Sequence, residues 1–267
     1  MPSDLPGHLS GHLPGHLPGI LVQGLGEGLR AWMSTRQGGV SAAPFDSLNV
    51  GRSSGDDPAA VAENRARVER QMGAPLVWLH QVHGTRCVRV ESGAGLETAD
   101  AAVTRQPNLT LAIQVADCLP VLLAAMDPQG RALAVGGAHA GWRGLAAGVL
   151  ENCVEQLRDM APGAGLRAWL GPCIGPLAFE VGAEVHEAFA DDAALLRFAP
   201  RADGDPRWLA DLQGLAVARL ERLGIHTILR EPACTFSEAS RFHSFRRDGS
   251  RSGRLVACIR LGDGLLA

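Results

Sequence analysis

Three apolar runs in the middle of the chain constrain its fold most. They are Leu109–Val115, Leu119–Met126 and Ala132–Ala138, and turn residues separate them. Apolar runs of this length are typical of strands that are buried in a sheet. The segment Leu145–Met160 follows with apolar residues at helical spacing. Buried strands followed by an amphipathic helix favour an α/β fold.

Further elements extend this pattern toward both ends of the chain. The other predicted helices are 57–72, 181–198 and 209–223, and the other predicted strands are 30–34, 77–83, 169–173, 227–229 and 255–261. Residues 87–91 are expected to return as the partner strand of 77–83. Because loops are short and no linker interrupts the elements, the sequence predicts a single α/β (α+β) domain with a mixed β-sheet core flanked by helices.

The N-terminal segment differs in composition from the rest of the chain. Residues 5–19 read LPGHLSGHLPGHLPG, a repeat dense in proline and glycine that carries three regularly spaced histidines. Proline and glycine at this density disfavour both helix and strand. We therefore expect residues 1–19 to be a disordered tail and residues 20–267 to form one catalytic domain.

The absence of lysine limits the chemistry that is available. All 25 basic residues are arginine, and tyrosine is absent as well. A lysine Schiff base and a P-loop lysine are therefore both excluded. An anionic ligand would have to be held by arginine, histidine, backbone N–H groups or a metal ion.

Charge and hydropathy exclude other classes of partner. The net charge of −3 gives no general attraction for nucleic acid or an anionic membrane. No run of apolar residues is long enough to span a bilayer, and no signal-peptide pattern begins the chain. These features predict a cytoplasmic protein that binds neither nucleic acid nor membrane; the oligomeric state stays open.

Three polar residues with metal-binding side chains lie where buried strands end. They are His83 in HQVHG, Cys118 in ADCLP and His139 in GAHAGWRG. Two imidazoles and one thiolate form a good partial shell for zinc, which often keeps its fourth position open in catalytic sites. The spacing matches no short zinc motif, so two other interpretations stay open. The residues could be two histidines and a thiol of the core, or Cys118 and His139 could form a nucleophile–base pair.

His80 is separated from His83 by an odd number of positions. In a strand the two side chains would face opposite sides, so they could not share one metal ion. We therefore assign His83 to the site and expect His80 to be a surface or packing residue.

A glycine-rich turn, residues 136–144, carries His139 and precedes a predicted helix. Glycines let a backbone approach a ligand, and Arg143 could add a bidentate contact to phosphate. Further arginines stand in loops at Arg36, Arg246, Arg247 and Arg254. A tight connection for the turn and surface ion pairs for the arginines are the simpler interpretations.

Eight stretches of the sequence together resemble one known family. They are TRQGGVS (35–41), SLNVG (47–51), WLHQVHGT (78–85), ADAAVT (99–104), ADCLPVLL (116–123), AHAGWRGL (138–145), WLGPCIGPLAFEVG (169–182) and RFHSFRRDGSRSGR (241–254). In this order they resemble the YfiH/YlmD-type proteins, which are also called laccase-like or multicopper polyphenol oxidoreductases. Phe179 stands where many family members carry tyrosine.

The resemblance implies a fold similar to the deamidase domain of cytotoxic necrotizing factors. It implies that His83, Cys118 and His139 are zinc ligands and catalytic residues, and that Arg36, Asn49, Arg143 and Arg246 contact the substrate. It also implies a purine nucleoside phosphorylase that acts with phosphate on adenosine, inosine and methylthioadenosine and has adenosine deaminase activity.

Two other activities stay open. The older family label implies a copper-dependent polyphenol oxidase, and the three residues do form a His₂Cys set that Cu²⁺ could occupy. However, three of the nine histidines lie in the N-terminal repeat, which leaves few for a multicopper cluster. The third possibility is a Cys–His hydrolase that edits peptidoglycan precursors.

Overall fold

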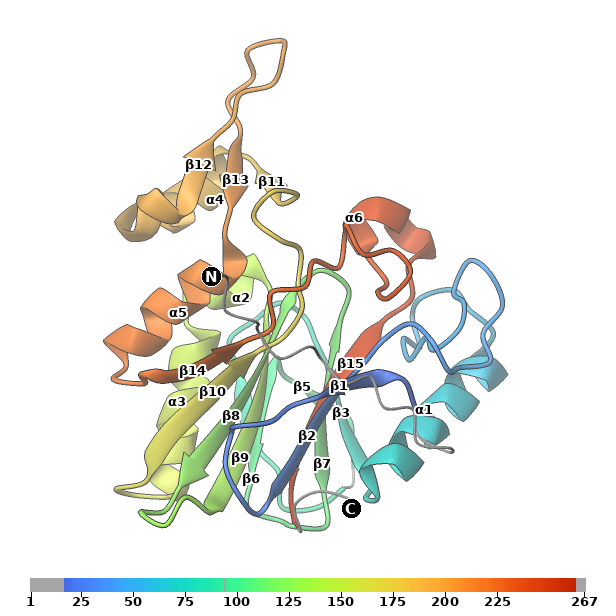
Figure 1. Ribbon diagram of the computed structural model, residues 1–267, viewed down its shortest axis with the longest axis vertical. Coiled ribbons are helices and arrows are strands. Elements are labelled where there is room, and N and C mark those ends of the chain that lie inside the picture. Colours follow the sequence, from blue (N-terminus) through green and yellow to red (C-terminus); the bar gives the residue numbers. More distant parts are fainter. Residues whose placement is uncertain (1–16, 94, 263–267) are drawn as a thin grey trace, which may run out of the picture.

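Two six-stranded sheets stacked face to face form the centre of the structure, and helices cover both outer faces (Figure 1). The computed structural model describes residues 17–93 and 95–262. Helix α1 packs on one outer face, and helices α3 and α5 pack on the other. A small three-stranded sheet stands at one end of this α–β–β–α sandwich, at the top of Figure 1.

The first large sheet has the strand order β1-β2-β15-β7-β3-β5. Its strands are β1 (Gly19–Leu21), β2 (Leu29–Ser34), β15 (Leu255–Leu261), β7 (Thr110–Val115), β3 (Leu76–His80) and β5 (Glu97–Thr98). β15 pairs antiparallel with both β2 and β7, so the C-terminal strand lies at the centre of this sheet. β3 pairs parallel with β7 and β5, which makes the sheet mixed.

The second large sheet has the order β14-β10-β8-β9-β6-β4. Its strands are β14 (Thr227–Arg230), β10 (Gly165–Leu170), β8 (Leu119–Met126), β9 (Ala132–Ala140), β6 (Ala101–Thr104) and β4 (Cys87–Arg89). The small sheet consists of β11 (Glu180–Val181), β13 (Trp208–Ala210) and β12 (Leu196–Phe198). β8 and β9 form a long antiparallel pair, which places the ends of both strands next to each other.

The helices are α1 (Pro58–Met72), α2 (Trp142–Ala147), α3 (Val149–Met160), α4 (Ala183–Ala188), α5 (Leu212–Arg222) and α6 (Phe245–Asp248), with 3-10 turns at Ala190–Leu195 and Gly249–Arg251. Local sequence explains where α1 begins and ends. Asp57 accepts a hydrogen bond from the Ala59 N–H, Pro58 occupies the first turn, and Gly73 ends the helix in the left-handed conformation.

The main core fills the space between the two large sheets. It contains Met33 and Ile113 from the first sheet and Leu122, Ala124 and Val135 from the second, all fully buried. A second cluster lies between the second sheet and α3, whose Cys153, Val154 and Leu157 face the strands. The strands between the two clusters are covered on both faces, which explains why β8 reads as an unbroken apolar run.

The predicted fold class, an α/β domain with a mixed sheet core flanked by helices, is confirmed, and the core is divided between two stacked sheets. The three central runs form β7, β8 and β9, and the predicted helix at 57–72 forms α1. Strand β9 continues through His139 to Ala140, two residues beyond the prediction.

Several predicted elements were wrong in detail. The strand predicted at 77–83 ends at His80, and the first residues of the helix predicted at 209–223 belong to β13. β4 does not return beside β3 but crosses to the second sheet, where it pairs with β6. The helix predicted at 145–160 is broken at Gly148, whose φ of 104° places it in the left-handed region that a helix cannot contain. The helix predicted at 181–198 consists of β11, α4, a 3-10 turn and β12.

Most of the predicted N-terminal tail lies outside the described residues, since the description begins at residue 17. Of its last three residues, Leu17 donates a backbone hydrogen bond to the Gln71 side chain and Gly19 begins β1. Within residues 17–93 and 95–262, no helix is long and apolar enough to span a bilayer.

Candidate metal centre

His83, Cys118 and His139 come together at one end of the sandwich, as predicted from their positions after buried strands. One potential ligand atom from each residue lies within 4.8 Å of the others. Cys118 directly precedes β8 and His139 lies near the end of β9, and the pairing of Pro120 with His139 places them side by side. His83 comes from the loop that crosses between the sheets, with a φ of 60°. The site therefore joins both sheets.

A buried carboxylate, Asp100, holds two of these residues in place. Its two oxygens accept hydrogen bonds from the backbone N–H groups of Val82 (3.1 Å), His83 (2.9 Å) and Gly84 (2.7 Å). One oxygen also lies 2.8 Å from Nδ1 of His139. The carboxylate thereby fixes the loop of His83 and directs Nε2 of His139 away from itself. Such a carboxylate–histidine pair is typical of metal sites.

The electrostatics of the three residues are strongly coupled. Burial of the Cys118 thiol opposes its ionisation, but the charge of His139 and hydrogen bonds from His139 and His83 lower the thiol pKa to about 6. Burial disfavours the charged form of His139, but the Cys118 thiolate and Asp100 raise the His139 pKa to about 9. Without a metal, the pair therefore favours a thiolate next to an imidazolium.

The donor set fits a zinc ion. A thiolate and two imidazole nitrogens are the ligands that zinc prefers, and the Sγ of Cys118 lies 3.7 Å from Nε2 of His83. The rings of His83 and His139 are nearly perpendicular, at 71°, with centroids 4.7 Å apart. The spacing of the three ligand atoms is compatible with one shared ion.

A cavity of about 680 Å³ opens next to these three residues. It is large enough for a small organic ligand. Two of the four residues predicted to contact substrate, Arg143 and Arg246, lie on its wall. Aromatic side chains provide apolar surfaces, namely Trp78, Trp142, Phe179 and Phe245. His80, which is exposed and 3.4 Å from the Thr98 hydroxyl, lies on the wall outside the candidate metal group.

The other two predicted substrate contacts do not line this cavity. Arg36 forms an ion pair with Asp46 at 3.3 Å and donates a hydrogen bond to the Ala239 carbonyl. Asn49 is fully buried, and its side-chain oxygen accepts hydrogen bonds from the backbone N–H groups of Gly51 and Arg254. Both residues hold loops together, and Arg36 lines a separate, smaller hollow.

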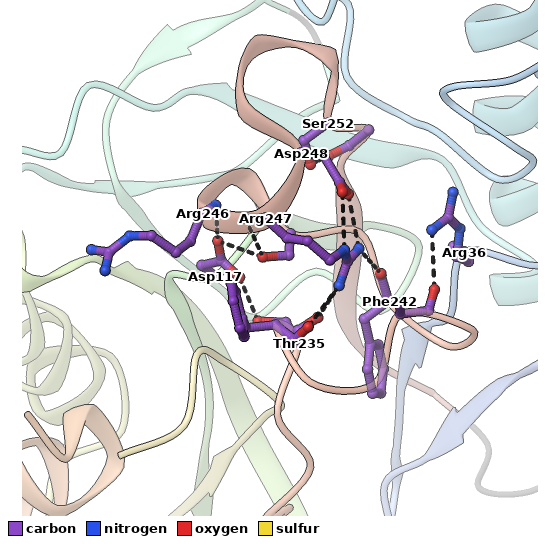
Figure 2. A network of polar contacts seen from close by, with 12 residues as sticks. Arg36, Asp117, Thr235, Phe242, Arg246, Arg247, Asp248 and Ser252 are labelled. Carbon is purple, nitrogen blue, oxygen red and sulfur yellow. Dashed lines mark hydrogen bonds and ion pairs between the residues drawn. The ribbon is translucent and has the colours of Figure 1, made fainter. Parts of the chain in front are cut away.

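Asp117 connects the C-terminal segment to the metal group. It is buried with a φ of 83°, and its carboxylate accepts hydrogen bonds from the Thr235 hydroxyl, the Ser244 hydroxyl and the backbone N–H of Arg246. Figure 2 shows these contacts converging on Asp117, while the Arg246 side chain extends away from them. The residue next to Cys118 thus fixes the loop that carries Arg246.

Asp100 and Asp117 are functional residues that the sequence analysis did not select. Both lie in recognised stretches, ADAAVT and ADCLP, but only Asp117 stands next to a predicted strand, since the strand that follows Asp100 was not predicted. Aspartates at strand ends are common in turns, and their partners come from segments far away in the sequence. Long-range contacts of this kind require the structure.

Comparison with known proteins shows which class of protein combines this two-sheet sandwich with a His–Cys–His group. The sequence model of a family described as multi-copper polyphenol oxidoreductase laccase matches residues 30–262. In solved structures, a Neisseria meningitidis protein of the same fold aligns with a TM-score of 0.84 at 37% identity, covering 92% of this chain and 99% of its own. The YlmD protein of Geobacillus stearothermophilus aligns with a TM-score of 0.79 at 29% identity, covering 92% of this chain and 100% of its own.

The chain belongs to the YfiH family. A Pseudomonas aeruginosa relative named purine nucleoside phosphorylase is 46% identical over 236 residues, which are 88% of this chain and 94% of the relative. The Escherichia coli protein named purine nucleoside phosphorylase YfiH is 43% identical over 240 residues, covering 88% and 95% of the two chains.

Proposed function

We propose that the protein is a zinc-dependent purine nucleoside phosphorylase that acts on adenosine, inosine and methylthioadenosine, with adenosine deaminase activity as a second reaction of the same cavity. The observation that carries the proposal is the convergence of His83, Cys118 and His139 beside a cavity that carries arginines. The names of the relatives supply the reaction class.

Phosphorolysis requires a cavity that positions phosphate next to C1′ of the ribose, offsets the charge of the phosphate and binds the purine. A phosphate oxygen forms a bond to C1′ of the ribose while the bond from C1′ to the purine nitrogen breaks, and the purine leaves with the electron pair and a proton. The arginines of the wall offset the charge of phosphate. Trp142, Phe179 and Phe245 provide flat apolar surfaces against which a purine could stack.

A zinc ion held by His83, Cys118 and His139 would supply a Lewis acid at this position. Asp100 keeps a hydrogen bond to Nδ1 of His139 and leaves Nε2 available to the metal. Cys118 would bind as a thiolate, which its lowered pKa favours. Deamination of adenosine replaces the amino group at C6 by oxygen from water, so it needs no phosphate.

Two observations favour other functions as alternatives. The ligands are also a His₂Cys set, and the matching family carries a copper oxidase description. Cys118, with its pKa of about 6 next to His139, also suits a Cys–His hydrolase of peptidoglycan precursors.

The test is the identification of products by mass spectrometry. Protein of known metal content is incubated with adenosine, with and without inorganic phosphate. We expect adenine and ribose 1-phosphate only when phosphate is present, and inosine from the deaminase reaction in either case. Adenine formed equally without phosphate would contradict phosphorolysis. No product in either case would favour phenol oxidation if copper is bound and hydrolysis if no metal is bound.

A further inference from the structure

The cavity contains more positive charge than the two arginines predicted from sequence. Arg52, Arg65 and Arg254 line the cavity together with Arg143 and Arg246. Among the described residues, none of these five side chains forms an ion pair with a carboxylate. Most other arginines of the described chain do form such pairs. Unpaired guanidinium groups in a cavity leave positive charge available for an anionic ligand.

Arg65 is the most firmly held of these side chains. It is 9% exposed, and its guanidinium lies 3.9 Å above the ring of Trp78. Its Nε donates a hydrogen bond to the Val50 carbonyl and one terminal nitrogen donates to the Gln114 side chain. These contacts fix the plane of the guanidinium at the cavity wall, so that little side-chain entropy is lost when a ligand binds.

Arg254, which lies near the C-terminal end of the sequence, is also held by hydrogen bonds. One terminal nitrogen donates hydrogen bonds to the carbonyls of Ser252 and Gly253. Its backbone N–H donates to Asn49, and its backbone carbonyl accepts from the Val50 N–H. Val50 therefore contacts both arginines, and Asn49 positions Arg254 from behind.

Both arginines line the same cavity as His83, Cys118 and His139. Burial lowers the pKa of Arg254, while the negative charges of Cys118 and Asp117 raise it. Burial together with the charge of Arg52 lowers the pKa of Arg65 to about 10. A bound anion would relieve this cost of burying unpaired cations.

The glycine-rich turn at 136–144 is a poorer candidate for the phosphate subsite. A Cβ atom at Gly141 would lie 2.9 Å from Cδ2 of His83, and one at Gly144 would lie 2.8 Å from the carbonyl oxygen of Gly84. These glycines therefore permit close packing against the His83 loop. α2, which follows the turn, has only six residues.

We propose that Arg65 and Arg254 form the subsite for the phosphate oxyanion, beside the His83–Cys118–His139 group. This assignment adds a phosphate subsite to the proposed function, and it rests on that function for the identity of the anion. In this arrangement Arg143 and Arg246 face the nucleoside, and Asn49 is a positioning residue that holds the loop of Arg254.

The test is the binding of inorganic phosphate to the zinc-loaded full-length protein, measured by titration calorimetry in the absence of nucleoside. Replacing Arg254 by Gln, or Arg65 by Gln, should weaken phosphate binding by at least about tenfold, since hydrogen bonds to charged groups contribute about 1.5–3 kcal/mol. Arg254→Lys retains the charge but not the planar fork, so its affinity should lie between those of the wild type and Arg254→Gln.

Matched controls separate this subsite from general charge effects and from misfolding. Arg131→Gln removes one exposed positive charge from a hairpin that does not line the cavity and should leave the phosphate Kd unchanged. Arg143→Gln, at the wall of the same cavity, tests the competing assignment: it should lose less phosphate affinity than Arg254→Gln does. Thermal unfolding of each variant identifies any that does not fold, and the two arginines provide independent tests.

The possible results separate this inference from the proposed function. If phosphorolysis occurs but both Gln variants bind phosphate as tightly as the wild type, the subsite assignment is wrong and the function stands. If the variants lose phosphate binding but no phosphorolysis occurs, the anion site is supported and the function is wrong. A wild-type protein that does not bind phosphate, or a tenfold loss in Arg143→Gln alone, would overturn the subsite.

Discussion

At the residue scale, Asp100 connects the two histidines of the candidate metal centre. Its buried carboxylate receives the N–H groups of three consecutive residues, 82–84, and contacts Nδ1 of His139. Burial raises its pKa, but the hydrogen bonds from His139 and from the backbone of Gly84 and Val82 outweigh this effect and lower it. The carboxylate is therefore ionised at neutral pH and can accept a hydrogen bond from each of these four groups.

Replacing Asp100 by Asn tests this role. The amide keeps the shape of the carboxylate but has only one acceptor oxygen, and its NH₂ group is a donor. It therefore cannot accept hydrogen bonds from all four donors. We expect zinc affinity to fall by about 10- to 100-fold, the usual effect of losing a partner of a histidine ligand. Competition with a chromophoric zinc chelator measures it. Asp159→Asn, an exposed aspartate on α3 that pairs with Arg89, is the control; equal affinities in Asp100→Asn and the wild type would contradict the role.

His243 shows a different consequence of burial. Its ring is fully buried, and neither nitrogen has a hydrogen-bond partner in the part of the chain that the structure describes. Burial and the charge of Arg36 lower its pKa to about 3. The unfolded chain binds a proton at about pH 6.5 and the folded protein does not, so the unfolded state holds more protons between about pH 6.5 and pH 3. Stability should therefore fall as the pH falls through this window.

The comparison is with His243→Phe, which keeps a ring but cannot titrate. Between pH 7 and pH 5 the wild type should lose about 2 kcal/mol more of its free energy of unfolding than the variant, from the linkage relation. Urea unfolding at the two pH values measures both losses. Equal losses in the two proteins would show that His243 is protonated in the folded state.

At the element scale, strand β9 approaches the opposite sheet closely because it contains small residues. A Cβ atom on Gly137 would lie 2.9 Å from Cγ1 of Ile113, which belongs to β7 in the first sheet. His139 is the second-last residue of β9, so any shift of this strand also moves a candidate metal ligand. The spacing of the sheets and the geometry of the site are therefore linked at this position.

Gly137→Ala should accordingly destabilise the protein by about 1–3 kcal/mol, the usual cost of overpacking a core. The matched control is Gly165→Ala in β10, where an added Cβ meets no atom within 4 Å. Denaturant unfolding of both variants gives the comparison. A Gly137→Ala protein as stable as the control would mean that the two sheets can separate without cost.

At the scale of the whole molecule, the sequence predicted the strands better than their arrangement. The apolar runs of β7, β8 and β9 and the proline and capping residues of α1 carry local signals, and these elements were confirmed. The crossing of the chain from β3 to β4 in the other sheet was not predictable, because the predicted strand 77–83 is followed at Gly84 by what looks like an ordinary hairpin turn. Partner choice between two sheets depends on contacts that are distant in sequence.

The same distinction applies to the site. Strand ends and the family resemblance pointed to His83, Cys118 and His139, and the structure brings these three together. Arg36 and Asn49 stand in recognised stretches but do not line the cavity, while Arg65 in α1 lies outside these stretches. Asp100 and Asp117 stand in recognised stretches, but nothing there marks their long-range partners. Residues that act through long-range contacts have no local pattern by which to recognise them.

The measurement that tests the account most directly is a zinc titration of metal-free protein, with phosphorolysis of adenosine followed at each step. We predict no activity without metal, a linear rise that ends at one zinc per chain, and no activity at any zinc concentration when Cys118 is replaced by Ala. Full phosphorolysis by metal-free protein, or zinc-dependent activity that survives in Cys118→Ala, would contradict a catalytic zinc centre formed by His83, Cys118 and His139.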